Sequence, residues 1–426
     1  MLTRWGETLD KNNVLGEYPR PQMRRSSFIN LNGLWDYAFT AAGEKQPDKW
    51  YGKILVPFSP ESELSGVGRT LSPDEYLWYR RDWAKPDVGE GRVILHFGAV
   101  DQSCTVYING LRAYRHNGGY LPFEFDATGF LSKDVNELSL SVRDVSDTSY
   151  HSRGKQKLKR GGIWYTPQSG IWQTVWAECI PKDCVRSLHI TPDFDHACVN
   201  VRADVVGESK AYALFDGQQY PLPASIPVPG FEPWSPENPK LYDFSVICGA
   251  DRVESYFAMR KFSVEADENG VKRLFLNGKP YFHNGLLDQG YWSDGMYTAP
   301  SDEALIFDIQ TAKEMGFNML RKHIKIEPLR WYYHCDRLGM LVWQDMINGG
   351  GAYKLLTVSA PLFTHRHHSD RNYRRFARTD ADGRAAYYTE LLEMVRQLYN
   401  CPCIVMWVPF NEGWGQFDAA EAVRRI

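Results

Sequence analysis

Several features that mark common classes of protein are missing from this sequence of 426 residues. No apolar run approaches the roughly 20 residues that a membrane-spanning helix needs. The opening residues, MLTRWGETLD, contain no apolar stretch like that of a secretory signal peptide. These absences predict a soluble protein without a membrane partner. They favour the cytoplasm slightly and leave the compartment open.

An excess of one charge is missing as well. The chain has 49 Lys and Arg residues against 52 Asp and Glu, a formal net charge of -3, and we identify no basic block. A nucleic-acid backbone or an anionic membrane is therefore not an expected partner, and a neutral ligand fits better. The eight cysteines lack the spacing of zinc ligands and of disulfide-rich miniproteins. We expect buried thiols, no metal and no cofactor.

Aromatic side chains are abundant, at 14% of residues, with 14 Trp and 24 Tyr. Flat apolar rings with a polar edge suit sugars, although aromatic-rich sandwich cores explain most of such a content. The length exceeds what one hydrophobic core supports, since cores stop growing near roughly 250 to 300 residues. Two to four domains are expected.

Residues 1–180 are predicted to form an antiparallel β-sandwich. From about Phe28 to Cys179 the chain reads as short strands, and Asn109-Gly110 between two alternating runs is a type I′ hairpin signal. No helical period of useful length occurs before residue 300. Residues 181–264 are predicted to form a second β domain of the size of an immunoglobulin-like sandwich. A proline-rich stretch lies between its predicted strands.

After about Glu265 strands and helices alternate, which predicts parallel strands joined by right-handed crossovers, in either a barrel or an open sheet. The predicted strands are KPYFHNGLL, NMLRKHI, MLVWQDM and CIVMWVPF. The predicted helices are SDEALIFDIQTAKEMGF, with Ser301 as N-cap, PLRWYYHCDRLG and GRAAYYTELLEMVRQLY, the last preceded by a long loop to about Asp382.

A closed eight-stranded barrel needs about 250 residues, whereas about 160 follow Glu265. The sequence therefore predicts that residues 265–426 are the N-terminal half of a TIM barrel, ending in a helix without a C-cap. Uncovered strand edges would favour self-association into a homo-oligomer or marginal stability.

Ligands collect at the carboxyl ends of parallel strands, and polar residues follow the predicted strands at those ends. They are His283, Asn284 and Asp288 at the first, Arg321, Lys322 and His323 at the second, Trp343 and Asp345 at the third, and Asn411 and Glu412 at the fourth. Polar residues around a protonatable carboxyl, with aromatic platforms, suit a sugar site without metal.

Three stretches, FINLNGLWDYAF, SGIWQTVWAE and NCPCIVMWVPFNEGWG, resemble glycoside hydrolase family two, the β-galactosidases, β-glucuronidases and β-mannosidases. They follow the family's domain order, so the resemblance implies a sugar-binding jelly roll at residues 1–180, then an immunoglobulin-like sandwich and a TIM barrel. The resemblance implies that Glu412 is the acid/base of a retaining exo-β-glycosidase and that Asn411 holds the sugar 2-hydroxyl. A general acid needs a raised pKa, which burial beside an aromatic residue such as Trp414 and a second carboxylate would supply. The alternative is that Glu412 is an ordinary carboxylate that follows a strand, is exposed to water and has no catalytic role.

The family's nucleophile, a Glu on the seventh barrel strand, has no counterpart here. The sequence as written is therefore not expected to be a competent enzyme. Asp345 is expected to bind a sugar hydroxyl, with a nucleophilic role as the alternative. Arg321 matches a family arginine, and a structural ion pair is as plausible as a substrate contact. The family's R-x-S-H reads Arg321-Lys322-His323-Ile324, which displaces His323 to the opposite strand face unless the strand bulges.

Trp343 and Trp414 are candidate sugar platforms, with core packing as the default. The run His365–His368 lies in a predicted loop without helical spacing, so a metal there is not expected. A non-catalytic carbohydrate-binding protein, using the jelly roll or the open half-barrel, is the rival to the glycosidase.

Overall fold

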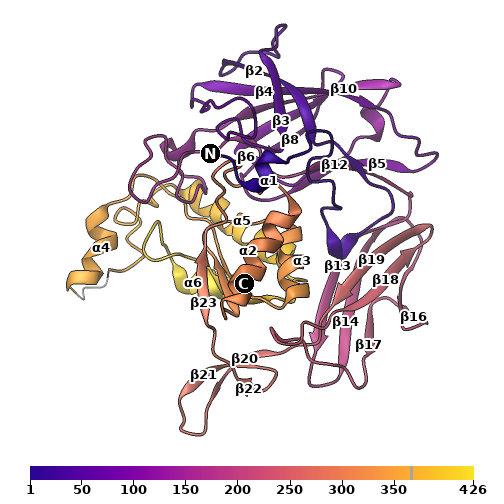
Figure 1. Cartoon of the computed structure of the whole chain (residues 1–426), viewed down its shortest axis with the longest axis vertical. Coiled ribbons are helices and arrows are strands. Elements are labelled where there is room, and N and C mark those ends of the chain that lie inside the picture. Colours follow the sequence, from indigo (N-terminus) through magenta and orange to yellow (C-terminus); the bar gives the residue numbers. More distant parts are fainter. Residues whose placement is uncertain (365–367) are drawn as a thin grey trace.

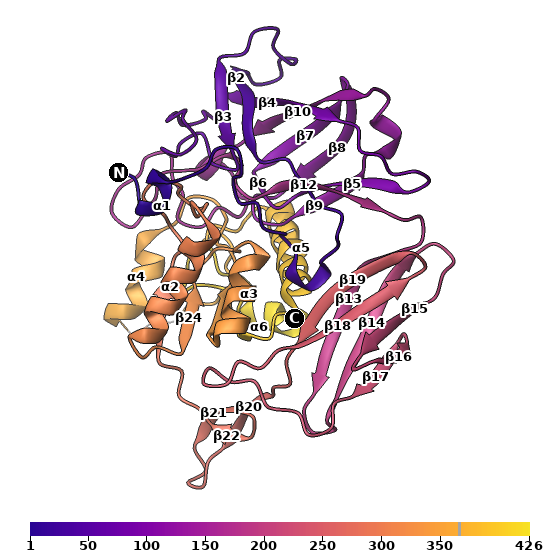
Figure 2. The same ribbon diagram turned by 45° about the vertical axis from the view of Figure 1, so that its right-hand side comes forward.

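The computed structural model describes residues 1–364 and 368–426 and divides into two β-sandwiches and an open α/β unit. In Figure 1 the first sandwich lies across the top, the α/β unit lies below it, and the second sandwich stands beside the α/β unit. Figure 2 shows the same arrangement after a 45° turn, with the small sheet of β20, β21 and β22 projecting below the rest.

The first sandwich packs a six-stranded antiparallel sheet, in the order β3-β2-β4-β10-β7-β8, against a four-stranded sheet, β1-β12-β5-β9. A further pair, β11 and β6, lies beside them. The strands are β1 (Ile29–Asn30), β2 (Gly33–Ala41), β3 (Gly52–Val56), β4 (Glu75–Ala84), β5 (Arg92–Phe97), β6 (Val100–Asp101), β7 (Ser103–Ile108), β8 (Leu111–Asn117), β9 (Phe123–Asp126), β10 (Val135–Arg143), β11 (Gly170–Ile171) and β12 (Val175–Ile180). The short helices here are α1 (Arg4–Glu7) and the 3-10 turns η1 (Pro21–Met23), η2 (Thr128–Phe130) and η3 (Ser146–Thr148).

The jelly-roll interpretation of this part is confirmed, and local sequence explains its details. Asn109 and Gly110 both have positive φ, 52° and 78°, and turn β7 directly into β8, as a type I′ hairpin requires. In β12, Val175 and Ala177 enter the sandwich core while Trp176 points to the opposite face and stacks on His96. Trp176 and His96 therefore lie on the outer face of the four-stranded sheet, away from the sandwich core.

The second sandwich packs β13-β14-β17 against β16-β15-β18-β19, and the predicted immunoglobulin-like fold is confirmed. Its strands are β13 (Cys184–Asp193), β14 (Cys198–Val206), β15 (Ala211–Phe215), β16 (Gln218–Pro221), β17 (Ala224–Pro227), β18 (Tyr242–Cys248) and β19 (Asp251–Phe257). The proline-containing strands β16 and β17 both lie at sheet edges. Proline lacks the amide hydrogen that a central strand must donate, so the edge is where it fits.

A small antiparallel sheet of β20 (Phe262–Ala266), β21 (Lys272–Leu276) and β22 (Lys279–Pro280) leads into the α/β unit. The prediction that residues from Lys279 to Leu287 form one strand is wrong. Asn277 and Gly278, with φ of 53° and 76°, turn β22 back onto β21, so the first parallel strand begins only at Gly285. His283 and Asn284 therefore precede this strand and do not follow it.

The α/β unit is a four-stranded parallel sheet in the order β23-β24-β25-β26, the partial TIM barrel that the sequence predicts. Its elements are β23 (Gly285–Asp288), α2 (Asp302–Glu314), β24 (Met319–Lys322), α3 (Leu329–Leu338), β25 (Leu341–Asp345), α4 (Leu355–Thr364), α5 (Ala381–Leu398), β26 (Ile404–Val408) and α6 (Ala419–Arg425). Ser301 caps α2 by accepting a hydrogen bond from the Ala304 amide, as predicted. Helix α4 lies where a continuous loop is predicted, so that interpretation is wrong.

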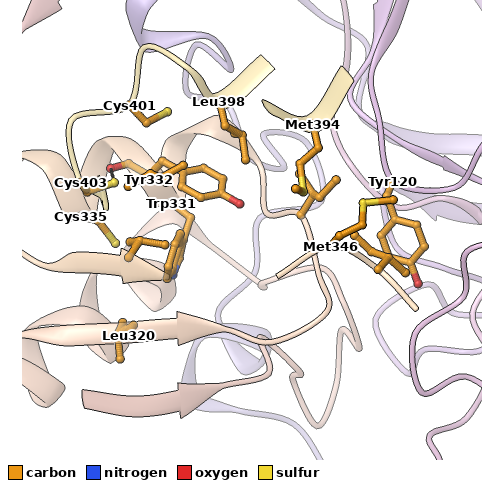
Figure 3. Packing of buried hydrophobic residues seen from close by; sticks show 14 of the residues in the cluster. Tyr120, Leu320, Trp331, Tyr332, Cys335, Met346, Met394, Leu398, Cys401 and Cys403 are labelled. Atoms are coloured by element: carbon orange, nitrogen blue, oxygen red, sulfur yellow. Dashed lines mark hydrogen bonds between the residues drawn. The ribbon is translucent and has the colours of Figure 1, made fainter. Parts of the chain in front are cut away.

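One hydrophobic cluster joins all three domains. It centres on α3, α5 and the parallel strands, and it takes in Tyr120 and Trp172 of the jelly roll and Trp234 of the second sandwich. Figure 3 shows this packing from Cys335 and Cys403 at one end to Tyr120 at the other. Because the interfaces share a continuous core, the domains are held in fixed relative positions.

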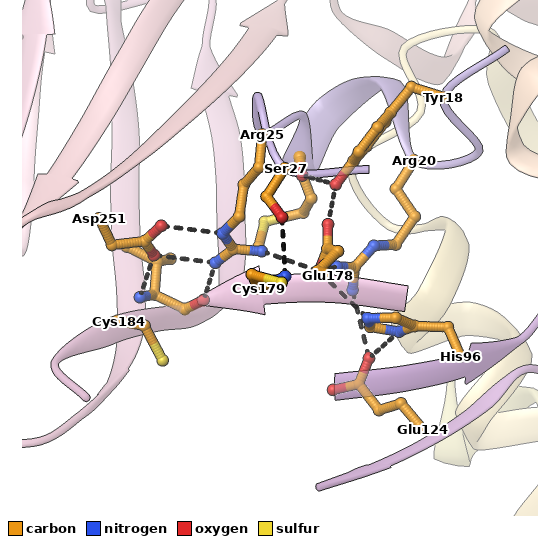
Figure 4. Close-up of polar contacts among 12 residues, drawn as sticks. Tyr18, Arg20, Arg25, Ser27, His96, Glu124, Glu178, Cys179, Cys184 and Asp251 are labelled. Atoms are coloured by element: carbon orange, nitrogen blue, oxygen red, sulfur yellow. Dashed lines mark hydrogen bonds and ion pairs between the residues drawn. The ribbon is translucent and has the colours of Figure 1, made fainter. Parts of the chain in front are cut away.

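A buried polar network fastens the N-terminal segment to both sandwiches (Figure 4). Arg25 donates two hydrogen bonds of 2.9 Å to the Asp251 carboxylate on β19 and a third, of 3.3 Å, to Glu178 on β12.

Among the described residues no helix is long and apolar enough to cross a membrane.

Candidate active site

The candidate site lies at the carboxyl ends of β24, β25 and β26, where the parallel register brings distant parts of the sequence together. Arg321 on β24 pairs with Trp343 on β25, and Asp345 at the end of β25 pairs with Val408 on β26. Asn411 and Glu412 follow β26 after two residues. The fold thus gathers polar side chains from three strand ends.

Arg321, Asp345 and Asn411 form one hydrogen-bonded unit. The Arg321 guanidinium donates to both oxygens of Asp345, at 2.9 and 3.0 Å, and its Nη2 donates to Asn411 Oδ1 at 2.8 Å. Asp345 is fully buried and Asn411 is 4% exposed, whereas the Arg321 side chain is 28% exposed. The ion pair expected as one alternative for Arg321 is present, and it orients both neighbours.

His323 joins this unit, although the sequence register suggests the opposite strand face. Strand β24 ends at Lys322, and Ile324 adopts a left-handed conformation with φ of 46°. The chain therefore leaves the pleat, and His323 Nδ1 lies 3.0 Å from Asp345 Oδ2. Arg321 and His323 together occupy both oxygens of the Asp345 carboxylate.

Glu412 lies in a turn with a left-handed backbone, φ 53°, and its side chain is exposed. The prediction of a buried proton donor is therefore wrong in this structure. The strand ends at Val408, and the turn carries Glu412 outward from the buried Asn411. The predicted aromatic neighbour is present, since Trp414 Nε1 donates a 2.7 Å hydrogen bond to Glu412 Oε2.

Trp414 is held by aromatic rings from two other segments. Trp164, in the loop between η3 and β11 of the jelly roll, meets it edge-on at 5.4 Å between ring centroids, and Tyr353 does so at the same distance. Trp164 and Tyr353 stack on each other at 6.1 Å. The sequence interpretation missed Trp164 and Tyr353, and no local motif marks either one.

Trp343 lies on the same face of β25 as Asp345, two residues earlier along the strand. Its Nε1 donates a 2.9 Å hydrogen bond to His283 Nδ1, and its ring packs against the main hydrophobic cluster. The structure therefore places the partly buried Trp343 beside His283.

A second charged cluster lies behind the strand ends and was not predicted as a unit. Lys322 donates 2.8 Å hydrogen bonds to Asp288 and Glu327, and Lys325 donates to the same Glu327 oxygen at 2.8 Å. Burial lowers the pKa of Lys325 to about 8, and attraction to Glu327 opposes this shift. The cluster joins the ends of β23 and β24.

No group of three or more metal-binding side chains occurs in the part of the chain that the structure describes. Of the histidine run, residues 365–367 lie outside the described residues. A cavity of about 750 Å³ lies between the sandwiches and helices α3 and α5, and none of the candidate site residues lines it.

Comparison with known proteins places these features in a family. The model for the sugar-binding domain of family 2 glycosyl hydrolases matches residues 69–176, and the model for the TIM-barrel domain of that family matches residues 269–425. A β-galactosidase of Photobacterium profundum is 26% identical over 398 residues, which cover 85% of this chain and 35% of that protein. The chain spans less than half the length of the curated relatives it matches.

Two solved structures have the same arrangement of domains. The β-D-glucuronidase of Dictyoglomus thermophilum has a TM-score of 0.75 at 17% identity and covers 96% of this chain, which covers 71% of it. The β-glucuronidase of Faecalibacterium prausnitzii has a TM-score of 0.71 at 20% identity, with coverage of 96% and 72%. These likenesses show a shared fold over both sandwiches and the α/β unit. The chain belongs to glycoside hydrolase family 2.

Proposed function

We propose that this chain carries the acid/base half of a retaining exo-β-glycosidase, with Glu412 as the catalytic acid/base. The carrying observation is the Asn411-Glu412 pair after β26, with Asn411 fixed by Arg321 and Asp345. A β-galactoside is our first choice of substrate, because a curated β-galactosidase relative aligns with most of the chain. A β-glucuronide or a β-mannoside comes next. We propose no metal and no cofactor.

The geometry assigns Asn411 a defined direction. Arginine can only donate hydrogen bonds, so the Asn411 oxygen must face Arg321, and the amide nitrogen points elsewhere. Its Nδ2 has no partner among the described residues and is free to donate to a sugar hydroxyl. Such a bond to the 2-hydroxyl strengthens as the oxocarbenium-like transition state develops.

Glu412 would first protonate the oxygen of the leaving group and then activate water. Its left-handed backbone, which costs roughly 1 to 2 kcal/mol for an L-residue, turns the carboxylate out of the sheet toward the open face. Trp414 holds one carboxylate oxygen and leaves the other free of the indole. His323, Trp343 and Trp414 complete the proposed substrate-binding set together with Asn411, Asp345 and Arg321.

Asp345 is a poor choice for the nucleophile. A nucleophilic carboxylate needs a free oxygen, whereas Arg321 and His323 engage both oxygens of Asp345. We therefore propose that Asp345 orients the binding residues. The polypeptide of these 426 residues is accordingly proposed to bind sugars without turning over a glycoside.

The alternative, a carbohydrate-binding protein without catalysis, is favoured by one observation, the exposure of Glu412. General acids usually lie in a pocket that shields them from water, and Glu412 is exposed. We propose domains at residues 1–180, 181–264 and 265–426, with a carbohydrate as partner, neither nucleic acid nor membrane, and a homo-oligomer through the uncovered edges of the parallel sheet.

Glu412→Gln in a full-length protein that also supplies the nucleophile tests the proposed role. Hydrolysis of lactose should fall by about 10² to 10⁴-fold, because its leaving group needs protonation. Hydrolysis of 4-nitrophenyl β-D-galactoside should fall far less in its first step, because nitrophenolate leaves without a proton. The values of kcat/KM on both substrates give the comparison, because kcat/KM reports the first step, in which the leaving group departs.

Glu268→Gln, at an exposed position in the β20–β21 turn, is the matched control and should leave both rates unchanged. Equal rates for wild type and Glu412→Gln on lactose would reject the acid/base role. Turnover by the 426-residue polypeptide that Asp345→Asn abolishes would reject our assignment of Asp345.

A further inference from the structure

The cavity where the three domains meet, which we call the interdomain cavity, has a volume of about 750 Å³. Pockets that hold small molecules usually enclose about 300 to 1,000 Å³. Its walls come from the four-stranded sheet of the jelly roll, from β13 and β14 of the second sandwich, and from α2, α3 and α5 of the α/β unit. The N-terminal segment before β1 supplies a further wall. Since none of the candidate site residues lines this cavity, a ligand there would bind apart from the candidate active site.

The buried walls of the interdomain cavity are largely apolar. Buried apolar side chains from all three domains line it, among them Leu121, Phe123 and Trp172 of the jelly roll, Leu188 of the second sandwich and Leu305 of α2. Such walls favour a ligand with a large apolar body, because its burial removes apolar surface from water on both sides.

The rim of the interdomain cavity is charged and exposed. Arg186 and Asp204 of the second sandwich and Glu393 and Arg396 of α5 line the cavity and are exposed to solvent. The cavity therefore opens between the second sandwich and α5. Its cations and anions balance, so the rim favours neither a cationic nor an anionic ligand.

Four polar atoms in the walls have no hydrogen-bonding partner among the described residues. They are Trp176 Nε1 on β12, Arg20 Nε and Glu17 Oε2 in the N-terminal segment, and Gln397 Oε1 on α5. Trp176 is only 3% exposed. Because buried polar groups in proteins are nearly always hydrogen-bonded, unpaired donors and acceptors around one cavity indicate a ligand that pairs with them.

Trp176 and Arg20 place two of these donors close together. His96 stacks on the Trp176 ring, with 4.7 Å between centroids and planes 6° apart, and so fixes the indole. The Arg20 guanidinium carbon lies 5.9 Å from the centre of the Trp176 ring. The Nη atoms of Arg20 bind Glu124 and Glu178 (Figure 4). These contacts neutralise the guanidinium and leave Arg20 Nε and Trp176 Nε1 as unpaired donors.

The unpaired atoms fit a ligand that both accepts and donates hydrogen bonds. Trp176 and Arg20 offer donors, whereas Glu17 and Gln397 offer acceptors, and a hydroxyl group serves both. A sugar carries hydroxyls on most of its ring carbons, and each hydroxyl that the apolar walls leave unpaired is costly to bury. A phenol combines a flat apolar body with few hydroxyls, and its O–H donates strongly to a carboxylate.

We propose that the interdomain cavity binds an uncharged phenolic compound that carries two or more hydroxyl groups. Its hydroxyls accept hydrogen bonds from Trp176 and Arg20 and donate to Glu17 and Gln397, and its rings pack against the apolar walls. This inference goes beyond the proposed function and does not depend on it.

Calorimetric titration of the whole chain with 4,4′-dihydroxybiphenyl tests the proposal. One molecule should bind per chain, about tenfold more tightly than 4-hydroxybiphenyl, which has the same rings and lacks one hydroxyl. Cellobiose is the neutral sugar probe. Cellobiose should show no binding that depends on Trp176 or Gln397.

Trp176→Phe removes the indole N–H and keeps an apolar ring, and Gln397→Leu removes an acceptor at a partly exposed position of α5. Each should weaken binding of dihydroxybiphenyl by about threefold to tenfold, which one neutral hydrogen bond typically contributes. Trp83→Phe is the matched control. Trp83 on β4 is also 3% exposed, its Nε1 also lacks a partner among the described residues, and it does not line the cavity. This variant should bind as wild type does.

Four results would overturn the inference. They are no saturable binding of dihydroxybiphenyl, equal affinity for the two biphenyls, unchanged affinity in Trp176→Phe and Gln397→Leu, and an equal loss in Trp83→Phe. Binding of cellobiose that Trp176→Phe weakens would identify a sugar site and overturn it as well. None of these results bears on the role of Glu412, because Glu412 does not line the cavity.

Discussion

At the scale of single residues, Asp345 organises the candidate site. Its carboxylate is fully buried and accepts hydrogen bonds from Arg321 and His323, and Arg321 in turn fixes Asn411. Burial of such a charge is stable only while its partners neutralise it. The arrangement therefore ties the stability of the strand ends to the geometry of the site.

Asp345→Ala should destabilise the protein by about 2 to 4 kcal/mol, because it leaves the partly buried Arg321 without its carboxylate. Urea unfolding of wild type and variant gives the free-energy difference. Lys53→Ala removes the more exposed ion pair between Lys53 and Asp36 and should have little effect. Equal losses in the two variants would contradict a special role for Asp345.

Sequence alone could predict part of this site. The positions of Arg321, Asp345 and Asn411 follow from recognising three parallel strands and their ends. The position of His323 does not, because it depends on the left-handed turn at Ile324, which no local signal announces for a β-branched residue. The exposure of Glu412 is likewise decided by the turn that follows Asn411.

At the scale of elements, helix α3 shows how one glycine fits a helix end to a neighbouring domain. Gly339 follows α3 with φ of 74°, as the sequence predicts for a residue that terminates a helix. A Cβ atom here would lie 2.5 Å from the Pro236 carbonyl oxygen in the second sandwich. Glycine is therefore required both by the backbone and by the domain contact.

Gly339→Ala should lower the free energy of unfolding by about 2 kcal/mol or more, through strain in φ and the clash with Pro236. Gly270→Ala is a matched comparison, since its φ is 76° and open space surrounds its Cα. That variant should lose only the conformational part, about 1 kcal/mol. Thermal or urea unfolding of the two variants separates the cost of the backbone strain from the cost of the clash with Pro236. Equal decreases in the free energy of unfolding would show that the contact with Pro236 relaxes at no cost.

The elements that sequence predicts well are those with clear periodicity and end signals, such as α2 with its Ser301 cap. Helix α4 was missed because Pro361 and β-branched residues within Leu355–Thr364 argue against a helix. The loop of residues 151–168 could be recognised as irregular, but the hydrogen bonds of Arg153 and Gly154 to Asn348 could not be predicted, since nearly 200 residues separate the two segments.

At the scale of the whole molecule, Asp336 connects α3 to two other parts of the chain. Its carboxylate accepts 2.7 Å hydrogen bonds from Tyr256 Oη on β19 and from the Cys403 amide before β26. Burial raises the pKa of Asp336 to about 6, and the hydrogen bonds of Cys403 and Tyr256 oppose this shift. Burial at this junction therefore makes the Asp336 carboxyl easier to protonate than it is in water, although the ionised form still dominates at pH 7.

A carboxyl whose pKa is higher in the folded than in the unfolded state contributes stability that is complete below about pH 4. This stability is lost as the pH rises through about 6. Asp336→Asn removes the titration while keeping an acceptor for Cys403. Relative to wild type, the variant should gain up to about 3 kcal/mol between pH 4 and pH 7.5. Urea unfolding at both pH values checks this, and a constant difference would contradict it.

The sequence by itself determined the two sandwiches, the alternating strands and helices, and the strand ends that carry Arg321, Asp345, Asn411 and Glu412. These follow from local periodicity and end signals, which depend on neighbouring residues. Only the tertiary structure decided that His323 reaches Asp345, that Glu412 is exposed, and that Trp164 of the first sandwich packs against Trp414. Those outcomes depend on how segments far apart in the chain pack, and packing is a property of the whole fold.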